Sequence, residues 1–258
     1  MNIHVANNFL ISSPLEQFNV KSIIPLYFGN FDISFTNSSL YFLFCTGIIL
    51  ILFQAVTLNG GFLVPTRWQS IVEIIYDFVV SLVGEQIGEK GKPYFTWIFT
   101  TFILILACNL VGMIPYSFTT TSHVAVTFGL ALSLFVGITI IGFQNHGLHF
   151  FSFFLPKGTP LALVPLLVLI EVMSYCTRPI SLGVRLFVNL ISGHALLKIL
   201  SGFAWTMLTS GGALAVGSLI PFVVIVAITG LELAVSSLQA YVFCILTCIY
   251  LKDAIDLH

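Results

Sequence analysis

The stretch "PISLGVRLFVNLISGHALL", residues 179–197, places an arginine and a histidine inside a run that is otherwise apolar enough for a membrane. The Arg185 guanidinium does not lose its proton at accessible pH, so this side chain stays charged wherever the fold puts it. On insertion scales an ionisable side chain near the membrane centre costs about 2.5–3.5 kcal/mol. Arg185 is therefore a functional candidate.

The amino-acid composition indicates whether this stretch is surrounded by lipid or by water. Of the 258 residues, 58% are hydrophobic and 7% are charged, against about 25% charged in soluble domains. The sequence thus predicts an all-α integral membrane protein. A net charge of −1 without a basic tract gives no sign of a nucleic-acid partner. The five cysteines lie in apolar runs, so neither a disulfide framework nor a zinc site is expected.

Five long apolar segments are expected to be embedded in the membrane. Residues 40–58, 94–114 and 124–143 each hold about twenty residues, the length that crosses a hydrocarbon core of about 30 Å. Residues 161–202 and 211–251 are each about forty residues long, and a continuous helix of that length would reach roughly 60 Å. Because neither contains a polar hairpin turn, we expect two long helices that are tilted or bent.

Positive charge predicts the orientation of the chain. The basic residues of the joints gather after the first, before the second and after the third span: Arg67, Lys90, Lys92 and Lys157. The joints 115–123 and 201–210 contain no lysine or arginine. By the positive-inside rule the N-terminus lies outside and the C-terminus inside. Residues 1–37 are then an outer, loop-like extension without assigned chemistry, and residues 38–258 form one membrane domain. The triplet at Asn37 matches a glycosylation acceptor, a pattern that is frequent by chance.

Residues 68–89 predict an amphipathic helix on the inner surface. Its apolar residues recur at helical spacing, and its polar positions recur every fourth residue: Glu73, Asp77, Ser81, Glu85 and Glu89. Interfacial lipid-binding helices are usually basic on the polar face, whereas this one is acidic. A docking edge for a partner subunit and a merely solvated face both fit the pattern.

The long segment 161–202 carries polar residues on two faces if it is helical. One stripe contains Glu171, Ser174, Arg178, Ser181, Arg185, Asn189 and Ser192. Glu171 and Arg185 share nearly the same azimuth and lie roughly 21 Å apart along the axis. His194 points to the opposite face. The last segment carries a further stripe of Thr229, Glu232, Ser236 and Gln239. Hydrogen bonds between helices explain the serines, threonine and amides equally well, whereas Arg185 and Glu232 are stronger functional candidates.

The strings "SLGVRLFVNLISGH" and "ELAVSSLQAYVFCILTCIYL" resemble the a subunit of F-type ATP synthases, the stator half of a proton channel beside a rotating c-subunit ring. The resemblance runs from about residue 40 to residue 251. The hallmark is an arginine followed by Leu-Phe and then by Asn at the fourth position. "SPLEQF" and "HGLHFFSFFLPKGTP" resemble mitochondrial members. The resemblance implies a surface helix, a hairpin (94–114 and 124–143) and two nearly horizontal helices around the ring.

The resemblance also implies roles for individual residues. Arg185 is similar to the essential stator arginine, and Glu171 to the acidic group of the inner exit half-channel. His194 and Glu232 are similar to the outer pair that admits protons. The supporting polar neighbours are Asn189, Gln239, Ser181 and Ser236. Bacterial members usually carry a carboxylate at the place of His194 and a histidine at that of Glu232, so this arrangement implies a mitochondrial inner membrane protein. Arg178 departs from the pattern; pairing with Glu171 and contact with lipid headgroups both remain open.

These roles agree with the physical properties of the side chains. A fixed guanidinium blocks a proton leak and stabilises an ionised ring carboxylate. A carboxyl group and an imidazole can hold and pass protons instead. The chain is then a non-catalytic subunit of a complex that makes ATP, without a cofactor or metal of its own, whose partners are the c-ring, the peripheral stalk and other membrane subunits. Sodium in place of protons would need a cluster of oxygen ligands, expected mostly on the ring.

Two other classes of protein remain as alternatives. A secondary transporter also places charges at mid-membrane, but it usually has two repeated halves with interrupted helices, and no such repeat is evident here. An intramembrane enzyme would need a nucleophile with its base or a metal cluster. The pair His146 and His149 lacks further ligands, so a structural role is favoured over a metal site.

Overall fold

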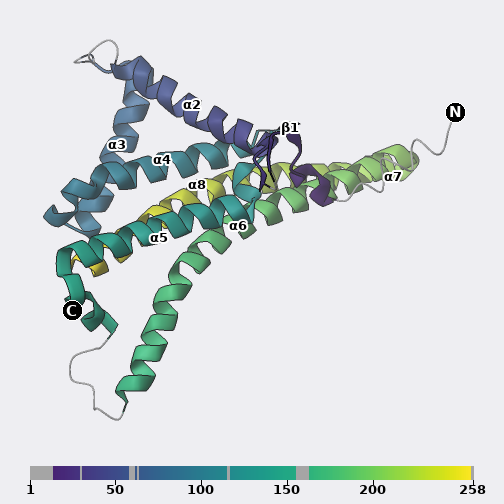
Figure 1. Ribbon diagram of the computed structural model, residues 1–258. Helices are drawn as coiled ribbons and strands as arrows, with labels where there is room; N and C mark the ends of the chain where they lie inside the picture. Colours follow the sequence, from purple (N-terminus) through teal and green to yellow (C-terminus); the bar gives the residue numbers. More distant parts are fainter. Residues whose placement is uncertain are drawn as a thin grey trace.

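The computed structural model describes residues 14–29, 31–57, 62, 64–114, 117–154 and 163–256, and these are mostly helical (Figure 1). The prediction of an all-α integral membrane protein is confirmed. Five of the described helices are long and apolar enough to cross a membrane. They are α2 (Asn37–Thr57), α4 (Phe95–Gly112), α5 (Val124–His146), α6 (Val164–Ser210) and α8 (Leu219–Ile255).

The described residues before α2 fold back on themselves in short elements. A 3₁₀ turn, η1 (Pro14–Phe18), precedes β1 (Ser22–Ile24), which pairs antiparallel with β4 (Phe35–Thr36). Between these strands, β2 (Tyr27–Phe28) pairs with β3 (Phe31–Asp32). This region was expected to be loop-like, and its pairing is a small departure from an all-helical chain. Residues 1–13, also part of the predicted extension, lie outside the described residues.

The amphipathic helix is α3 (Arg67–Gln86), followed by the 3₁₀ turn η2 (Glu89–Tyr94). The Thr66 hydroxyl starts α3 by accepting a hydrogen bond from the Gln69 backbone N–H over 3.4 Å. Its buried residues include Val79, Leu82 and Val83, which join the core, whereas its acidic residues are exposed: Glu73, Asp77 and Glu85. The docking edge and the solvated face both stay predictions.

The helix α6 is longer than predicted. Its 47 residues would span about 70 Å, more than twice a hydrocarbon core of about 30 Å, so it cannot stand upright in a membrane. The prediction that residues 201–210 form a joint was wrong, because this stretch is helical. Its hydroxyl groups donate to backbone carbonyls three or four residues earlier, as Thr209 does to Trp205 over 3.0 Å; such bonds let Ser and Thr remain in a helix. The helix ends where Gly211 and Gly212 take positive φ angles of 73° and 62°.

The last predicted helix, 211–251, consists of two pieces. A short helix, α7 (Gly212–Gly217), is followed by α8, which begins at Leu219 and continues beyond the predicted end to Ile255. In Figure 1, α8 runs back beside α6, and α6 changes direction along its length. Pro179 lies inside α6; because proline lacks an N–H and crowds the carbonyl four residues earlier, it is a defined place for a bend.

The core lies where α4, α5, α6 and α8 pack together. Its buried residues from α6 and α8 are Leu182, Leu186, Leu190, Ala240, Phe243, Cys244, Cys248, Leu251 and Ala254. Gly183 allows α6 to approach α5, because a Cβ there would lie 3.2 Å from the Phe128 Cα. Close packing of this kind drives helix association in membranes, where lipid removes most of the hydrophobic driving force. It brings the polar residues of α6 and α8 together.

Candidate functional site

Three polar contacts connect α6 and α8 and define the candidate site. Arg178 contacts Asp253, Asn189 contacts Gln239, and His194 contacts Glu232. Residue numbers rise along α6 while they fall along α8, as expected of an antiparallel helix pair. We call this set of three pairs the polar ladder. The α6 members of its last two pairs were predicted to lie on different faces, yet both reach α8.

His194 and Glu232 form the buried end of the polar ladder. His194 Nδ1 lies 3.0 Å from Glu232 Oε1, and the exposed fractions of the two side chains are 15% and 5%. The other ring nitrogen, Nε2, lies 3.0 Å from the hydroxyl oxygen of Thr119, between α4 and α5. Neither Glu232 oxygen has a well-aligned hydrogen bond with another described residue. The imidazole thus has a polar partner at each nitrogen.

A pair of amides continues the polar ladder toward the middle of α6. The Asn189 amide donates a hydrogen bond to Gln239 Oε1 over 2.9 Å. Beside them, the fully buried Asn109 of α4 donates to the Ser236 carbonyl over 3.1 Å. Asn109 Oδ1 and Gln239 Nε2 have no protein partner among the described residues. Buried polar atoms of this kind are usually satisfied by water, so this core can hold ordered water.

Arg185 lies between the first two contacts of the ladder in sequence but takes no part in them. Its side chain is exposed, as is that of Ser181 one turn earlier. No hydrogen bond or ion pair joins Arg185 to another described residue. Glu171 is half-buried and also stands apart from the polar ladder. Among the described residues, His194 and Glu232 therefore contact each other, whereas Arg185 and Glu171 join neither each other nor the polar ladder.

Arg178 has a partner that the sequence did not indicate. Its Nη1 lies 3.1 Å from Asp253 Oδ2, and its guanidinium carbon lies 5.0 Å from the ring centroid of Tyr250 and 5.6 Å from that of Tyr175. These distances are typical of cation–π contacts. Arg178 thus connects α6 to the C-terminal end of α8. The sequence had suggested Glu171 or lipid headgroups as its partner, and not Asp253.

The two ends of the polar ladder lie at different ends of the helix bundle. Near Asp253, Lys90 forms an ion pair with Asp256, and His146 Nε2 lies 2.9 Å from the Ile255 carbonyl oxygen. At this end, η2 and the C-terminal ends of α5 and α8 therefore lie close together. The contact of His146 agrees with the structural role favoured for this histidine.

Beside the opposite end of the polar ladder lie four buried hydroxyl groups of the joint between α4 and α5: Thr119, Thr120, Thr121 and Ser122. The next residue, His123, stacks on Phe118 with ring centroids 5.1 Å apart. Its partial burial lowers the pKa of the imidazole. Sequence reasoning missed Asn109, Thr119 and His123. For Asn109 the available signal was an amide in an otherwise apolar span.

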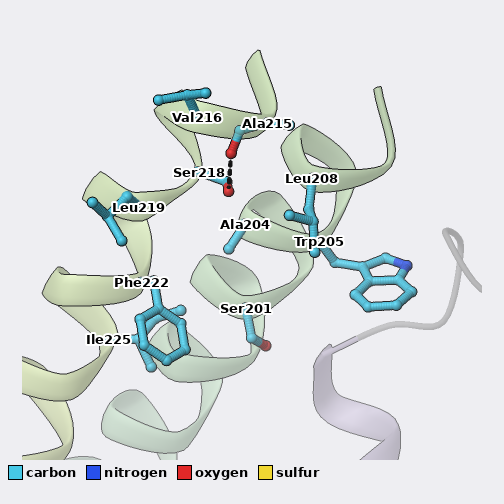
Figure 2. Close-up of a pocket in the computed structure, with 10 residues that line it drawn as sticks. All are labelled: Ser201, Ala204, Trp205, Leu208, Ala215, Val216, Ser218, Leu219, Phe222 and Ile225. Atoms are coloured by element: carbon cyan, nitrogen blue, oxygen red, sulfur yellow. Dashed lines mark hydrogen bonds between the residues drawn. The ribbon is translucent and has the colours of Figure 1, made fainter. Parts of the chain in front are cut away.

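A separate apolar pocket lies where α6, α7 and α8 meet (Figure 2). Its volume is about 650 Å³, and its lining includes Trp205, Leu208 and Phe222. The Ser218 hydroxyl donates a hydrogen bond to the Ala215 carbonyl oxygen over 2.6 Å. None of its described lining residues is titratable or belongs to the polar ladder.

Comparison with known proteins places this arrangement in a family. The family model described as "ATP synthase A chain" matches residues 39–252, which include Arg185 and every residue of the polar ladder except Asp253. The chain belongs to the ATP synthase subunit a family. It is 60% identical to ATP synthase subunit a of Marchantia polymorpha over 95% of this chain and 99% of the relative. Identity is 57% to subunit a-2 of Arabidopsis thaliana over 96% and 73%, and 53% to subunit a of Chondrus crispus over 97% and 99%.

As an ATP synthase subunit a, the chain is a membrane component of a rotary ATP synthase and takes part in ATP synthesis and proton transport. Membership also implies assembly with the other subunits of that complex. The resemblance noted in the sequence is thereby confirmed at the level of the family. Because the complex of this family transports protons, the titratable groups of the polar ladder are candidates for a proton path.

Proposed function

We propose that this chain is the stator half of the proton path in its ATP synthase, with two offset half-channels separated by Arg185. The observation that carries the proposal is the contrast along α6. His194 pairs with Glu232 inside the chain, whereas Arg185 is exposed and has no partner among the described residues. A permanently charged group in a membrane segment needs a counter-charge. A carboxylate on a partner that moves past α6 supplies one.

Arg185 acts as a barrier and as an electrostatic partner. Because the guanidinium keeps its proton, it cannot pass protons between the half-channels. A ring carboxylate that approaches Arg185 is stabilised in its ionised form and releases its proton. When the ring rotates the carboxylate away, the group can take up another proton. This cycle uses Arg185 without changing its charge.

His194 and Glu232 form the outer half-channel in this proposal. An imidazole with polar partners at both nitrogens can accept a proton on one side and release it on the other. Thr119 then belongs to the same path, at its contact with His194 Nε2. Asn189, Gln239 and Ser236 line the interval between this pair and Arg185, where orphaned amide atoms favour bound water.

Glu171 belongs to the inner half-channel, through which protons leave. The sequence predicts Glu171 on the stripe of Arg185, roughly 21 Å from it if the helix were straight, and Pro179 lies between the two residues. The half-buried position of Glu171 leaves the carboxylate free to pass protons toward the inner surface. A membrane potential of 100 mV supplies about 2.3 kcal/mol for each charge that crosses, and this energy biases the rotation.

We place the chain in the mitochondrial inner membrane, with its N-terminus in the intermembrane space and its C-terminus in the matrix. The pair of His194 on α6 and Glu232 on α8 is the exchanged arrangement that the sequence associated with mitochondria. The basic residue Lys90 pairs with Asp256 at the C-terminal end of α8, in agreement with one positive inner side. The expected partners are the c-ring, the peripheral stalk and other membrane subunits, and the chain itself carries no catalytic site for ATP.

Proton flux in liposomes tests the proposal against the alternative of a secondary transporter. The purified chain alone is expected to pass no protons, because the moving carboxylate is missing. The complex that contains the c-ring is expected to pass them under the same gradient. Sustained flux through the pure chain would overturn the stator proposal in favour of a transporter.

A further inference from the structure

Phe18 is the half-buried residue in an otherwise exposed part of the chain. All residues from 16 to 27 except Phe18 are exposed. The Phe18 ring lies against the ring of His194, with centroids 6.3 Å apart and planes inclined by 35°. This separation is within the range of aromatic pairs in proteins. The N-terminal segment therefore reaches a residue that lies more than 170 positions later in the sequence.

Three separate elements now surround the imidazole of His194. Glu232 of α8 lies at Nδ1, Thr119 lies at Nε2, and Phe18 of η1 lies beside the ring. The first two contacts engage the nitrogens in the plane of the imidazole. Phe18 adds an aromatic ring beside the imidazole, and the volume of that ring is closed to water.

The start of α2 holds the Phe18 segment in place. Asn37 Oδ1 accepts a hydrogen bond from the Lys21 N–H over 3.1 Å, and Asn37 Nδ2 donates to the Asn19 carbonyl over 3.2 Å. The Asn37 N–H donates to the Lys21 carbonyl over 3.1 Å. Two of these bonds engage the side chain of the candidate glycosylation residue. The turn that carries Phe18 is therefore tied to a long helix, and Figure 1 shows the purple N-terminal segment beside α6.

We propose that Phe18 is a positioning residue of the outer half-channel, which covers one side of His194 and holds its ring between Glu232 and Thr119. This inference rests on the proposed role of His194. It assigns a function to the N-terminal extension, for which the sequence indicated none. Orientation matters because a misplacement of about 1 Å in a reacting group can cost about 100-fold in rate.

Chemical labelling of His194 tests the contact independently of proton transport. Diethyl pyrocarbonate acylates imidazole, and mass spectrometry of the assembled complex in membrane vesicles, with the reagent on the outer side, gives the labelling rate of each histidine. In Phe18→Ala we expect His194 to react about 2- to 12-fold faster, the range equivalent to the loss of one aromatic pair. Phe18→Tyr should restore the original rate. His146, at the other end of the bundle, is the internal control, and Val20→Ala, at an exposed residue, is the matched variant.

The rate of proton-driven ATP synthesis in the same vesicles tests the positioning role. It should fall in Phe18→Ala and recover in Phe18→Tyr, while Val20→Ala stays at the original rate. If Phe18→Ala does not assemble, Phe18→Leu removes the ring but keeps apolar volume and is read in the same way. Unchanged labelling of His194 would overturn the contact. Faster labelling with unchanged synthesis would overturn the positioning role, and unchanged synthesis in His194→Asn as well would show that the proposed function itself fails.

Discussion

His194 lies between Thr119 and Glu232, with Nε2 3.0 Å from the Thr119 hydroxyl oxygen and Nδ1 3.0 Å from Glu232 Oε1. The three residues come from the joint between α4 and α5, from α6 and from α8. Their contacts join three separate parts of the chain through one titratable ring. A ring held in this way has a fixed orientation, which is what a proton relay between two defined partners needs.

Replacement of His194 and Glu232 should reveal that they act as one relay. His194→Asn and Glu232→Gln should each slow proton-driven ATP synthesis while assembly is kept. The double variant should lose clearly less than the sum of the two single losses, because residues in direct contact are not independent. Synthesis rates in vesicles at several outer pH values provide the measurement. Strictly additive losses, or a His194→Asn defect that responds only to the inner pH, would show that the half-channels are wrongly assigned.

Gly193 offers a test of the same contact from the backbone. A Cβ at this position would lie 2.5 Å from Glu232 Oε1 and 2.8 Å from its carboxyl carbon, so Gly193→Ala must push the carboxyl group away. We expect the synthesis rate to fall by up to about 100-fold, the effect of a misplaced reacting group. Gly202→Ala is the control in the same helix, because a Cβ there meets no atom within 4 Å. Equal rates in the two variants would contradict the functional contact.

The ion pair of Arg178 and Asp253 should stabilise the assembled chain. Their side chains are 18% and 28% exposed, so Arg178→Gln leaves a largely buried carboxylate without its partner. Breaking a buried pair costs about 3–5 kcal/mol, and partial exposure reduces this figure. We expect less assembled complex and faster thermal inactivation, with recovery in Arg178→Gln/Asp253→Asn.

The control for this ion pair is Lys92→Gln. Lys92 pairs with Glu89 where the two side chains are 71% and 84% exposed, and such surface pairs contribute little. Lys92→Gln should therefore leave assembly and thermal inactivation unchanged. If the double variant is as unstable as Arg178→Gln, the contact with Asp253 is not what stabilises α6 against α8.

The sequence predicted the fold class because composition and segment length are direct consequences of the lipid solvent. It also predicted that the two last apolar segments are too long to cross upright. It could not predict the pairing of Arg178 with Asp253, since partners between helices depend on rotation and bending, which Pro179 alters. The helical course of residues 201–210 was missed; serine and threonine remain in the helix there because their hydroxyl groups donate to backbone carbonyls within it.

The candidate site was only partly predictable for a related reason. Arg185, His194 and Glu232 stand out because ionisable groups are rare in apolar segments. Thr119 and Phe18 lie in segments of ordinary composition, and only the fold brings them to His194. The division of the chain into an outer extension and one membrane domain stays a prediction. The contact of Phe18 with α6 indicates that the two parts are not independent.

The most direct test of the central claim is the rate of proton-driven ATP synthesis by assembled complexes that carry Arg185→Lys. This substitution keeps the positive charge but replaces a planar, permanently protonated guanidinium with an ammonium that can lose its proton. Arg67→Lys, at the exposed start of α3, is the control and should keep the original rate. Arg185→Lys is expected to assemble and to lose synthesis by about 100-fold or more, the scale of losing one preorganised electrostatic group. A normal synthesis rate in assembled Arg185→Lys complexes would contradict the central claim.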